Sequence, residues 1–167
     1  MAAARTATRR SSSVQVWQSL FRIGVGAYWL YFASQKWPAP LGVGPTHGIG
    51  WMQPLMQKAA QVNPVPPLHD LLTLVVLPNW SLFAMAQAVG ESAVGVLLIL
   101  GIATRPAALV ATLLALNLSL TVAFTVSDPG LRWLYYLPVL AGFEVFVNGS
   151  GSLALDRARF VPGWLRA

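Results

Sequence analysis

The segment that most constrains this chain is the apolar run from Trp80 to Ile102, which carries one acidic residue, Glu91, near its middle. A helix of about 20 apolar residues spans the hydrocarbon core of a bilayer. A carboxyl group at that depth is costly unless it is neutral, paired or turned toward a polar cavity. The run therefore predicts a membrane-spanning helix with an ionisable group that faces the protein interior.

The composition agrees with a membrane protein. Of the 167 residues, 56% are hydrophobic and only 10% are charged, whereas a soluble domain averages about a quarter charged residues. The chain has no cysteine, which excludes disulfides, iron–sulfur clusters and thiolate metal sites. Its basic residues flank apolar segments and do not form a patch with interleaved aromatics, so we expect no nucleic-acid partner.

Four segments are long and apolar enough to cross a bilayer, namely 16–37, 79–104, 106–126 and 131–147. In a four-span arrangement, one side of the membrane holds Arg5, Arg9, Arg10, Arg105, Arg157, Arg159 and Arg166. The other side holds Lys36, Lys58 and Arg132. Because Lys and Arg favour the cytoplasm, both termini are predicted to lie inside.

We therefore expect an all-α, integral membrane four-helix bundle in the cell (inner) membrane, with the lipid bilayer as its surroundings. Residues 1–15 are predicted to form a basic cytoplasmic tail, 16–147 the bundle, and 148–167 a second basic cytoplasmic tail.

Residues 38–78 form the long outer loop of this arrangement, rich in proline and glycine. The apolar face shared by Trp51, Leu55 and Ala59 predicts a short amphipathic helix lying on the membrane. Residues 68–77 are apolar, but as a helix they reach only about 15 Å. We interpret them as an interfacial or re-entrant helix that is kinked into the second span at Pro78. A loop of this length usually carries a function or docks a partner.

Three polar residues lie at a depth comparable to Glu91 or can reach it: Lys36, Gln87 and Asn117. Together the four form a candidate intramembrane polar site. One interpretation is a structural, hydrogen-bonded carboxyl that holds the bundle in register. The other is a proton relay or a contact to a polar ligand, and the sequence leaves both open.

A second pair of polar residues, Arg22 and Glu144, lies at matching depths near the cytoplasmic ends of the first and last spans. This placement suggests an ion pair between the two helices. The alternative is that Arg22 reaches the lipid headgroups while Glu144 meets water.

The remaining patterns favour structural roles. Small residues recur every fourth position in the third span and predict a helix-packing face: Ala103, Ala107, Ala111, Ala115, Ser119 and Ala123. Tyr28 and Tyr31 could line a quinone pocket, although helix packing is the favoured interpretation. His47, His69 and Asp70 form a weak metal-binding pattern, and we expect no metal site.

Three segments resemble the DoxX/DoxD family of small membrane proteins. RIGVGAYWLYFASQKW (22–37) is similar to the first helix of the family, GESAVGVLLILGIATRPAA (90–108) to its second helix, and NGSGSLALD (148–156) to its glycine-rich tail. Two departures are the absence of glycine shortly before Lys36, where Ala33 and Ser34 stand, and the long first outer loop.

The resemblance implies a four-helix bacterial or archaeal membrane protein, with the small membrane subunit of thiosulfate:quinone oxidoreductase among the members of the family. Carried over to this chain, the pattern singles out Arg22, Lys36, Glu91, Gly95, Gly101, Arg105 and Asp156.

Three functions fit these observations. The first is a membrane subunit that anchors or assembles a larger oxidoreductase complex, with other membrane or peripheral redox subunits as partners and no catalysis by the chain alone. The second is the quinone-interacting subunit of a thiosulfate:quinone oxidoreductase, which makes quinone the one small molecule expected. The third is a small transporter or proton-conducting bundle that uses Glu91 as a relay.

Overall fold

The computed structural model describes residues 2–42 and 48–157, and side chains within 12–42 and 48–156. In this part of the chain every regular element is helical, which confirms the predicted all-α class. The elements are α1 (Ala2–Ser34), α2 (Met52–Val62), α3 (Pro66–Leu71), η1 (Leu72–Val76), α4 (Trp80–Leu100), α5 (Thr104–Leu120), η2 (Val122–Thr125), α6 (Pro129–Asn148) and η3 (Leu155–Arg157).

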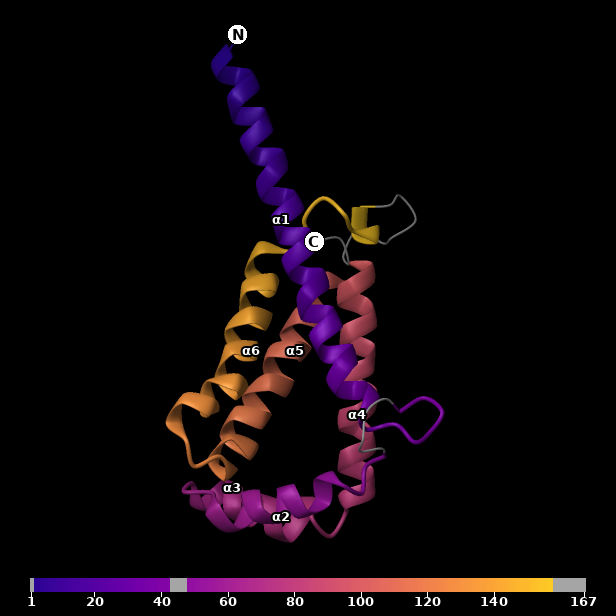
Figure 1. Cartoon of the computed structure of the whole chain (residues 1–167), viewed down its shortest axis with the longest axis vertical. Coiled ribbons are helices and arrows are strands. Elements are labelled where there is room, and N and C mark those ends of the chain that lie inside the picture. The colour runs from indigo at the N-terminus through magenta and orange to yellow at the C-terminus, as the bar shows by residue number, and fades with distance from the viewer. Residues whose placement is uncertain (1, 43–47, 158–167) are drawn as a thin grey trace.

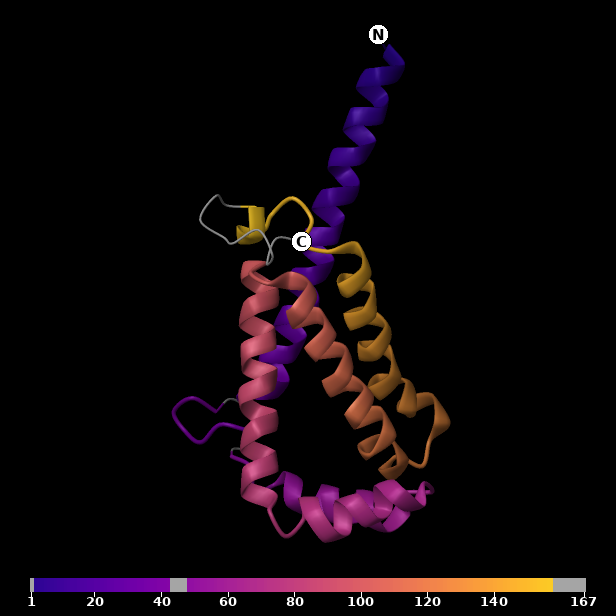
Figure 2. The ribbon, with the colours of Figure 1, turned by 180° about the vertical axis from the view of Figure 1, so that it is seen from behind.

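The long helices form two pairs arranged as a wedge. α1 packs along α4 and α5 packs along α6, whereas the contacts between the pairs are fewer. The pairs meet near the end of the molecule where α4 ends, α5 begins and α6 ends, and they spread apart toward the opposite end (Figures 1 and 2). The wide end of the wedge is closed by α2, α3 and η1, which lie across it. These three short elements are called the platform below.

Glycines allow the paired helices to approach closely. A Cβ atom on Gly26 of α1 would lie 2.9 Å from the carbonyl oxygen of Gly95 on α4, and one on Gly95 would lie 2.6 Å from Leu30. In the other pair, a Cβ atom on Gly142 of α6 would lie 2.7 Å from the Thr112 hydroxyl on α5. Any residue larger than glycine at these positions would push the two helices of a pair apart.

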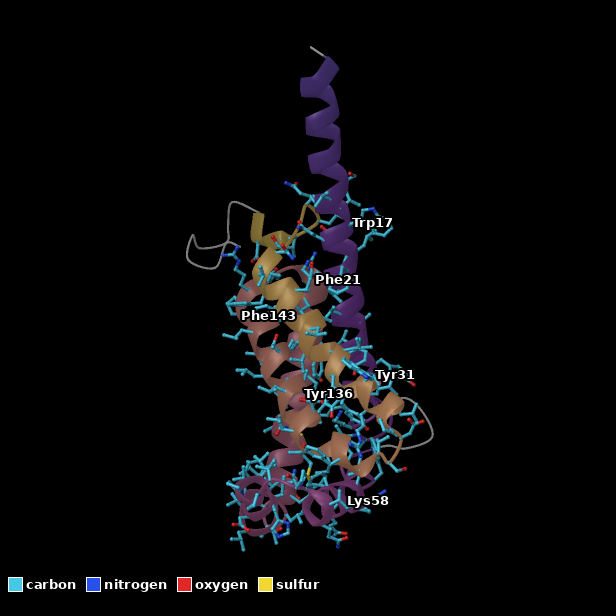
Figure 3. All side chains as sticks on the ribbon, turned by 90° about the vertical axis from the view of Figure 1, so that its left-hand side faces the viewer. Trp17, Phe21, Tyr31, Lys58, Tyr136 and Phe143 are labelled. Carbon is cyan, nitrogen blue, oxygen red and sulfur yellow. The ribbon has the colours of Figure 1, made fainter. Side chains whose placement is uncertain are left out.

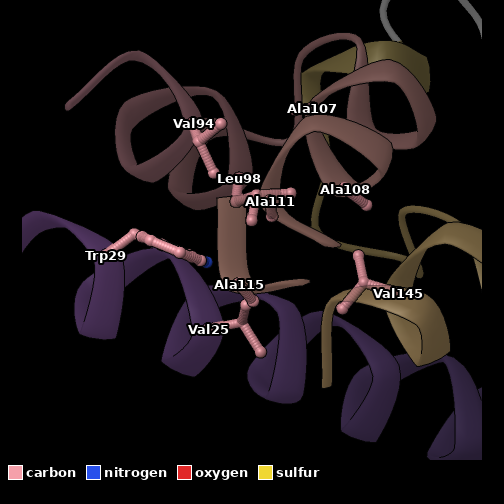
Figure 4. Close-up of a cluster of buried hydrophobic side chains, with 9 residues drawn as sticks. All are labelled: Val25, Trp29, Val94, Leu98, Ala107, Ala108, Ala111, Ala115 and Val145. Carbon is pink, nitrogen blue, oxygen red and sulfur yellow. The ribbon is translucent and has the colours of Figure 1, made fainter. Parts of the chain in front are cut away.

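The row of small residues on α5 is a packing face, as predicted. Its members Ala107, Ala111, Ala115 and Ser119 are buried. Three of them belong to the apolar core between the helices, which the close-up in Figure 4 shows together with Val25, Trp29, Val94, Leu98, Ala108 and Val145. The stripe therefore serves contacts within the chain and is not open to a partner.

Side-chain hydrogen bonds hold the platform against the helix ends. Lys58 Nζ on α2 donates to the Thr125 carbonyl oxygen at 3.0 Å, and Asn63 Nδ2 donates to that of Leu120 at 2.9 Å. On the other side, Trp51 Nε1 donates to the carbonyl oxygen of Gln35 at 3.1 Å. The predicted helix around residues 51–59 corresponds to α2, and residues 68–77 fall in α3 and η1.

In the described residues, two stretches are long and apolar enough to cross a membrane by length and composition, residues 80–100 and 104–125. They match the predicted second and third spans closely. The number of spans and the side on which each terminus lies stay predictions.

The first helix is longer than expected. The tail predicted over residues 1–15 is continuous with α1, which begins at Ala2. The reason is local, because no proline or glycine interrupts the chain before Gly24, and alanine and arginine are among the strongest helix formers.

Candidate functional site

A buried ion pair joins the end of α1 to the middle of α4. Lys36 Nζ lies 2.5 Å from Glu91 Oε2. Gln87, one helical turn before Glu91, donates from Nε2 to the other carboxylate oxygen at 2.7 Å. Glu91 is 0% exposed and Lys36 7%. Each carboxylate oxygen therefore has a partner, which makes the burial of this acid tolerable.

The turn that follows α1 sets the position of Lys36. Its amide donates to the Ala33 carbonyl oxygen at 2.9 Å, and Trp37 Nε1 donates to the hydroxyl of Ser92 on α4 at 3.0 Å. The Lys36 ammonium also donates to the carbonyl oxygen of Phe32 at 3.1 Å. An ammonium has three donors, so these two contacts leave one N–H for a further acceptor.

Next to this pair lies a cavity of about 320 Å³, within the range of small-molecule sites of about 300–1,000 Å³. Its lining residues come from α1, α4, α5 and α6 and from all three elements of the platform, so the cavity lies between the helix pairs and next to the platform. Its polar lining residues are Gln35, Lys36, Gln87, Asn117, Thr121 and Tyr135. Its aromatic walls are Phe32, Trp51, Trp80 and Phe83, and aliphatic side chains of α2, α3, η1, α5 and η2 complete it.

The structure thus brings the predicted polar residues to one place. Lys36 and Gln87 line the cavity, and Asn117 lines it from α5. Glu91 lies behind Lys36 and Gln87 and holds both through its two oxygens. Its geometry is that of a positioning residue for the two side chains that reach the cavity.

Sequence reasoning missed the walls contributed by the outer loop and by the last helix. The sequence predicts Trp51 on a helix that lies on the membrane and gives no site role to Trp80 or Tyr135, but all three line the cavity. The only sequence signal for these walls was the apolar helix face around Trp51. It indicates that this face is buried but does not identify the surface that it packs against.

The predicted ion pair between Arg22 and Glu144 is not formed in the structure. Arg22 is fully buried and donates to four backbone carbonyl oxygens instead. Two of them, on Leu98 and Ile99, belong to the end of α4, and two, on Ser150 and Leu153, belong to the tail. The pair fails because the glycine-rich tail folds back over α1 and places its carbonyls beside the guanidinium.

Glu144 has a partner on its own helix. Its Oε1 accepts from Asn148 Nδ2 at 2.9 Å.

Asp156 completes this second cluster at the start of α5. Its two carboxylate oxygens accept from the amides of Ala103 at 2.7 Å and Thr104 at 3.0 Å. A carboxylate at a helix N-terminus satisfies amides that otherwise lack partners. Gly101 has a φ of 66°, and a Cβ atom there would lie 2.7 Å from Ala154 Cβ and 2.8 Å from Arg22 Nη1. Arg22, Gly101 and Asp156 therefore form a structural clasp between the tail and the helix ends.

Other predicted residues lie away from the cavity. Tyr31 is 60% exposed, and Tyr28 lines a separate groove. Arg105 is exposed near the start of α5. His69 Nδ1 lies 2.6 Å from the Ala60 carbonyl oxygen. His47 and the tail beyond residue 157 lie outside the described residues.

The chain matches the model of a known protein family. No curated protein and no solved structure is similar enough to count as a match. A family model described as "TQO small subunit DoxD" matches residues 17–160. That range includes α4, α5 and α6, most of α1, and all the residues of the cavity and the clasp. The chain belongs to the DoxD family, as the three motifs indicated.

Proposed function

We propose that this protein is the integral membrane subunit of a larger quinone-linked oxidoreductase complex, and that its cavity binds the ring of a quinone. The observation that carries the proposal is the buried Lys36–Glu91 pair at the wall of a cavity that is otherwise mainly aromatic and aliphatic. A few convergent polar groups in an apolar pocket are typical of small-molecule sites.

The residues present fit a quinone ring. Its carbonyl oxygens need donors, and Lys36 has one N–H left beyond its contacts with Glu91 and Phe32. Asn117 lines the cavity from α5 and supplies a second amide donor. The faces of Trp51 and Trp80 offer surfaces for ring stacking.

A bound quinone would accept two electrons and two protons. The contribution of this chain is to hold hydrogen-bond donors where they would meet the carbonyl oxygens of the quinone ring. Glu91 fixes the ammonium of Lys36 and the amide of Gln87 in place.

The proposal requires partner subunits to supply the electrons, since the chain has no cysteine to hold an iron–sulfur cluster of its own. This requirement supports a role in anchoring or assembling redox subunits at the membrane, with thiosulfate as the proposed electron donor. We further propose four spans in the inner membrane with both termini cytoplasmic. The apolar side chains exposed along α1, α4, α5 and α6 suit contact with lipid.

The direct test measures quinone binding by the purified chain in lipid nanodiscs, with the quenching of tryptophan fluorescence as the readout. Trp51 and Trp80 line the cavity and should report occupancy. Replacing Asn117 by Leu should weaken binding about tenfold, the scale of a lost polar contact in an apolar site. Lys36→Met should weaken it further.

Gln57→Leu is the matched control, because Gln57 is exposed on α2 and does not line the cavity. Equal affinity for Asn117→Leu, Lys36→Met and the wild type would contradict the proposed site. A proton leak in vesicles that Glu91→Gln abolishes, without quinone binding, would favour the proton-conducting alternative.

The anchoring role is tested by purification from the native host in mild detergent. We expect redox subunits to co-purify in fixed stoichiometry and thiosulfate-dependent quinone reduction to require them. Activity of the isolated chain alone would contradict this role.

A further inference from the structure

A second hollow lies beside the cavity, between α1 and α6. It is a groove of about 350 Å³, and its lining has no charged residue. α1 contributes Phe21, Gly24 and Tyr28, and α6 contributes Leu134 and Leu137. Figure 3 views this side of the molecule, with α1 and α6 next to each other and Phe21 labelled. Phe21, Leu134 and Leu137 are largely exposed, so the groove opens toward the surroundings of the bundle, and its chemistry suits a hydrocarbon chain.

One layer of side chains separates the groove from the cavity. Tyr28 lines the groove and Phe32 lines the cavity, and their ring centroids are 4.7 Å apart. On the facing helix, Leu134 lines the groove and its neighbour Tyr135 lines the cavity. The two hollows are therefore adjacent compartments with an aromatic partition formed by Tyr28, Phe32 and Tyr135.

We propose that the groove holds the hydrocarbon tail of the quinone whose ring occupies the cavity, and that the ligand enters sideways from the membrane between α1 and α6. This inference rests on the proposed function. A cavity of about 320 Å³ has room for a ring but not for a long tail as well. The tail needs a path outward, and the groove supplies one beside the ring site.

The proposed entry path of the ligand follows the interface between α1 and α6. α1 packs closely on α4 and α6 packs closely on α5, whereas α1 and α6 share fewer contacts. Side chains at this seam can shift without breaking either helix pair. The proposal requires the rings of the partition, Tyr28 and Tyr135 among them, to rotate so that the groove and the cavity become continuous.

The test uses a glycine in the floor of the groove. A Cβ atom on Gly24 meets no atom within 4 Å, so Gly24→Leu fills the groove without a clash at its base. Ala27→Leu is the matched control, since Ala27 is exposed on the same helix and does not line the groove. Binding of a quinone with a long isoprenoid tail and of a tailless benzoquinone is compared in nanodiscs by fluorescence quenching.

We expect Gly24→Leu to weaken binding of the long-tailed quinone about tenfold or more, the scale of an overpacking penalty. Its affinity for the tailless quinone should stay within about twofold, and Ala27→Leu should alter neither. Leu137→Phe narrows the groove from the α6 side, at an exposed position. It should weaken binding in the same way as Gly24→Leu, and it keeps the inference testable if Gly24→Leu does not fold.

Unchanged binding of the long-tailed quinone to both variants would overturn the inference, and would leave the groove to an ordinary lipid chain. Equal weakening of both quinones would also overturn it, because the groove would then only support the cavity. These results are distinct from failure of the proposed function, in which neither quinone binds the wild-type chain.

Discussion

The two fully or nearly buried cations, Arg22 and Lys36, are stabilised in different ways. Lys36 faces a carboxylate, whereas the hydrogen-bond partners of Arg22 among the described residues are four carbonyl oxygens. The difference follows from their donors, because the guanidinium has five N–H groups in a planar fork and can satisfy several carbonyls at once.

Replacing Arg22 by Lys is therefore expected to destabilise the protein, although charge is kept. An ammonium has three donors, so at least one of the four carbonyls loses its partner, at a cost of about 1–3 kcal/mol. The melting temperature of the purified protein in detergent should fall. Arg105→Lys is the control, since Arg105 is exposed, and equal melting temperatures for the two variants would contradict the role of the clasp.

The Lys36–Glu91 pair makes a different prediction. Glu91→Leu leaves the ammonium buried without its counterion and should lower the free energy of unfolding by about 3–5 kcal/mol. The double variant Lys36→Met/Glu91→Leu should recover most of that loss, because no unpaired charge remains. Thermal unfolding of the single and double variants in one detergent measures this coupling. A double variant no more stable than Glu91→Leu would show that the pair is not the reason for the loss.

At the residue scale, the sequence singled out Arg22, Lys36 and Glu91, which are buried, but it predicted the hydrogen-bond partners of such residues less well. Depth along a helix places Lys36, Gln87 and Glu91 near one another, because side chains at similar depth in neighbouring spans can meet. The same argument failed for Arg22, since its partners are backbone carbonyls of a tail whose path no periodicity reveals.

At the scale of the elements, close helix pairs are set by glycines and alanines. α1 meets α4 through Gly26 and Gly95, and α5 meets α6 at Gly142. In lipid this closeness matters because helix association depends on dispersion and hydrogen bonding. The bounds of the second and third predicted spans agree with the structure within a few residues. The start of α1 and the crosswise course of the platform were set by local helix propensity and by tertiary contacts.

Substitution of Gly26 by Leu should separate α1 from α4 and move Lys36 away from Glu91. A Cβ atom at Gly26 would lie 2.9 Å from backbone atoms of both Gly95 and Ile99, which cannot move aside as a flexible side chain can. We expect a loss of at least about 1–3 kcal/mol, measured as a lower melting temperature. Gly90→Ala is the control, because its nearest neighbour would be a Leu114 methyl carbon at an ordinary 3.7 Å.

At the scale of the whole molecule, both described chain ends lie at the narrow end of the wedge and the platform lies at the wide end (Figures 1 and 2). The proposed four-span topology requires both chain ends on one side of the membrane, and the number of crossings stays a prediction. The wedge itself could not be predicted from the sequence, because hydropathy gives the number and length of helices but not the angle at which pairs diverge.

Labelling of single cysteines tests the orientation, and the natural absence of cysteine gives a clean background. An impermeant maleimide added outside intact cells should label Gln57→Cys on α2 and should not label Ser13→Cys on α1 until the cells are opened. Both positions are exposed. Labelling of both from outside would contradict the four-span arrangement with cytoplasmic termini.

The platform has a consequence for anyone who wishes to shorten or transplant this protein. A version reduced to α1, α4, α5 and α6 with short linkers would keep the Lys36–Glu91 pair but leave the cavity open at one end. Trp51, Leu68 and Val76 supply part of the cavity wall at that end. A shortened version that keeps the proposed quinone site must therefore retain residues 51–76, because they cover the cavity as well as connecting two helices.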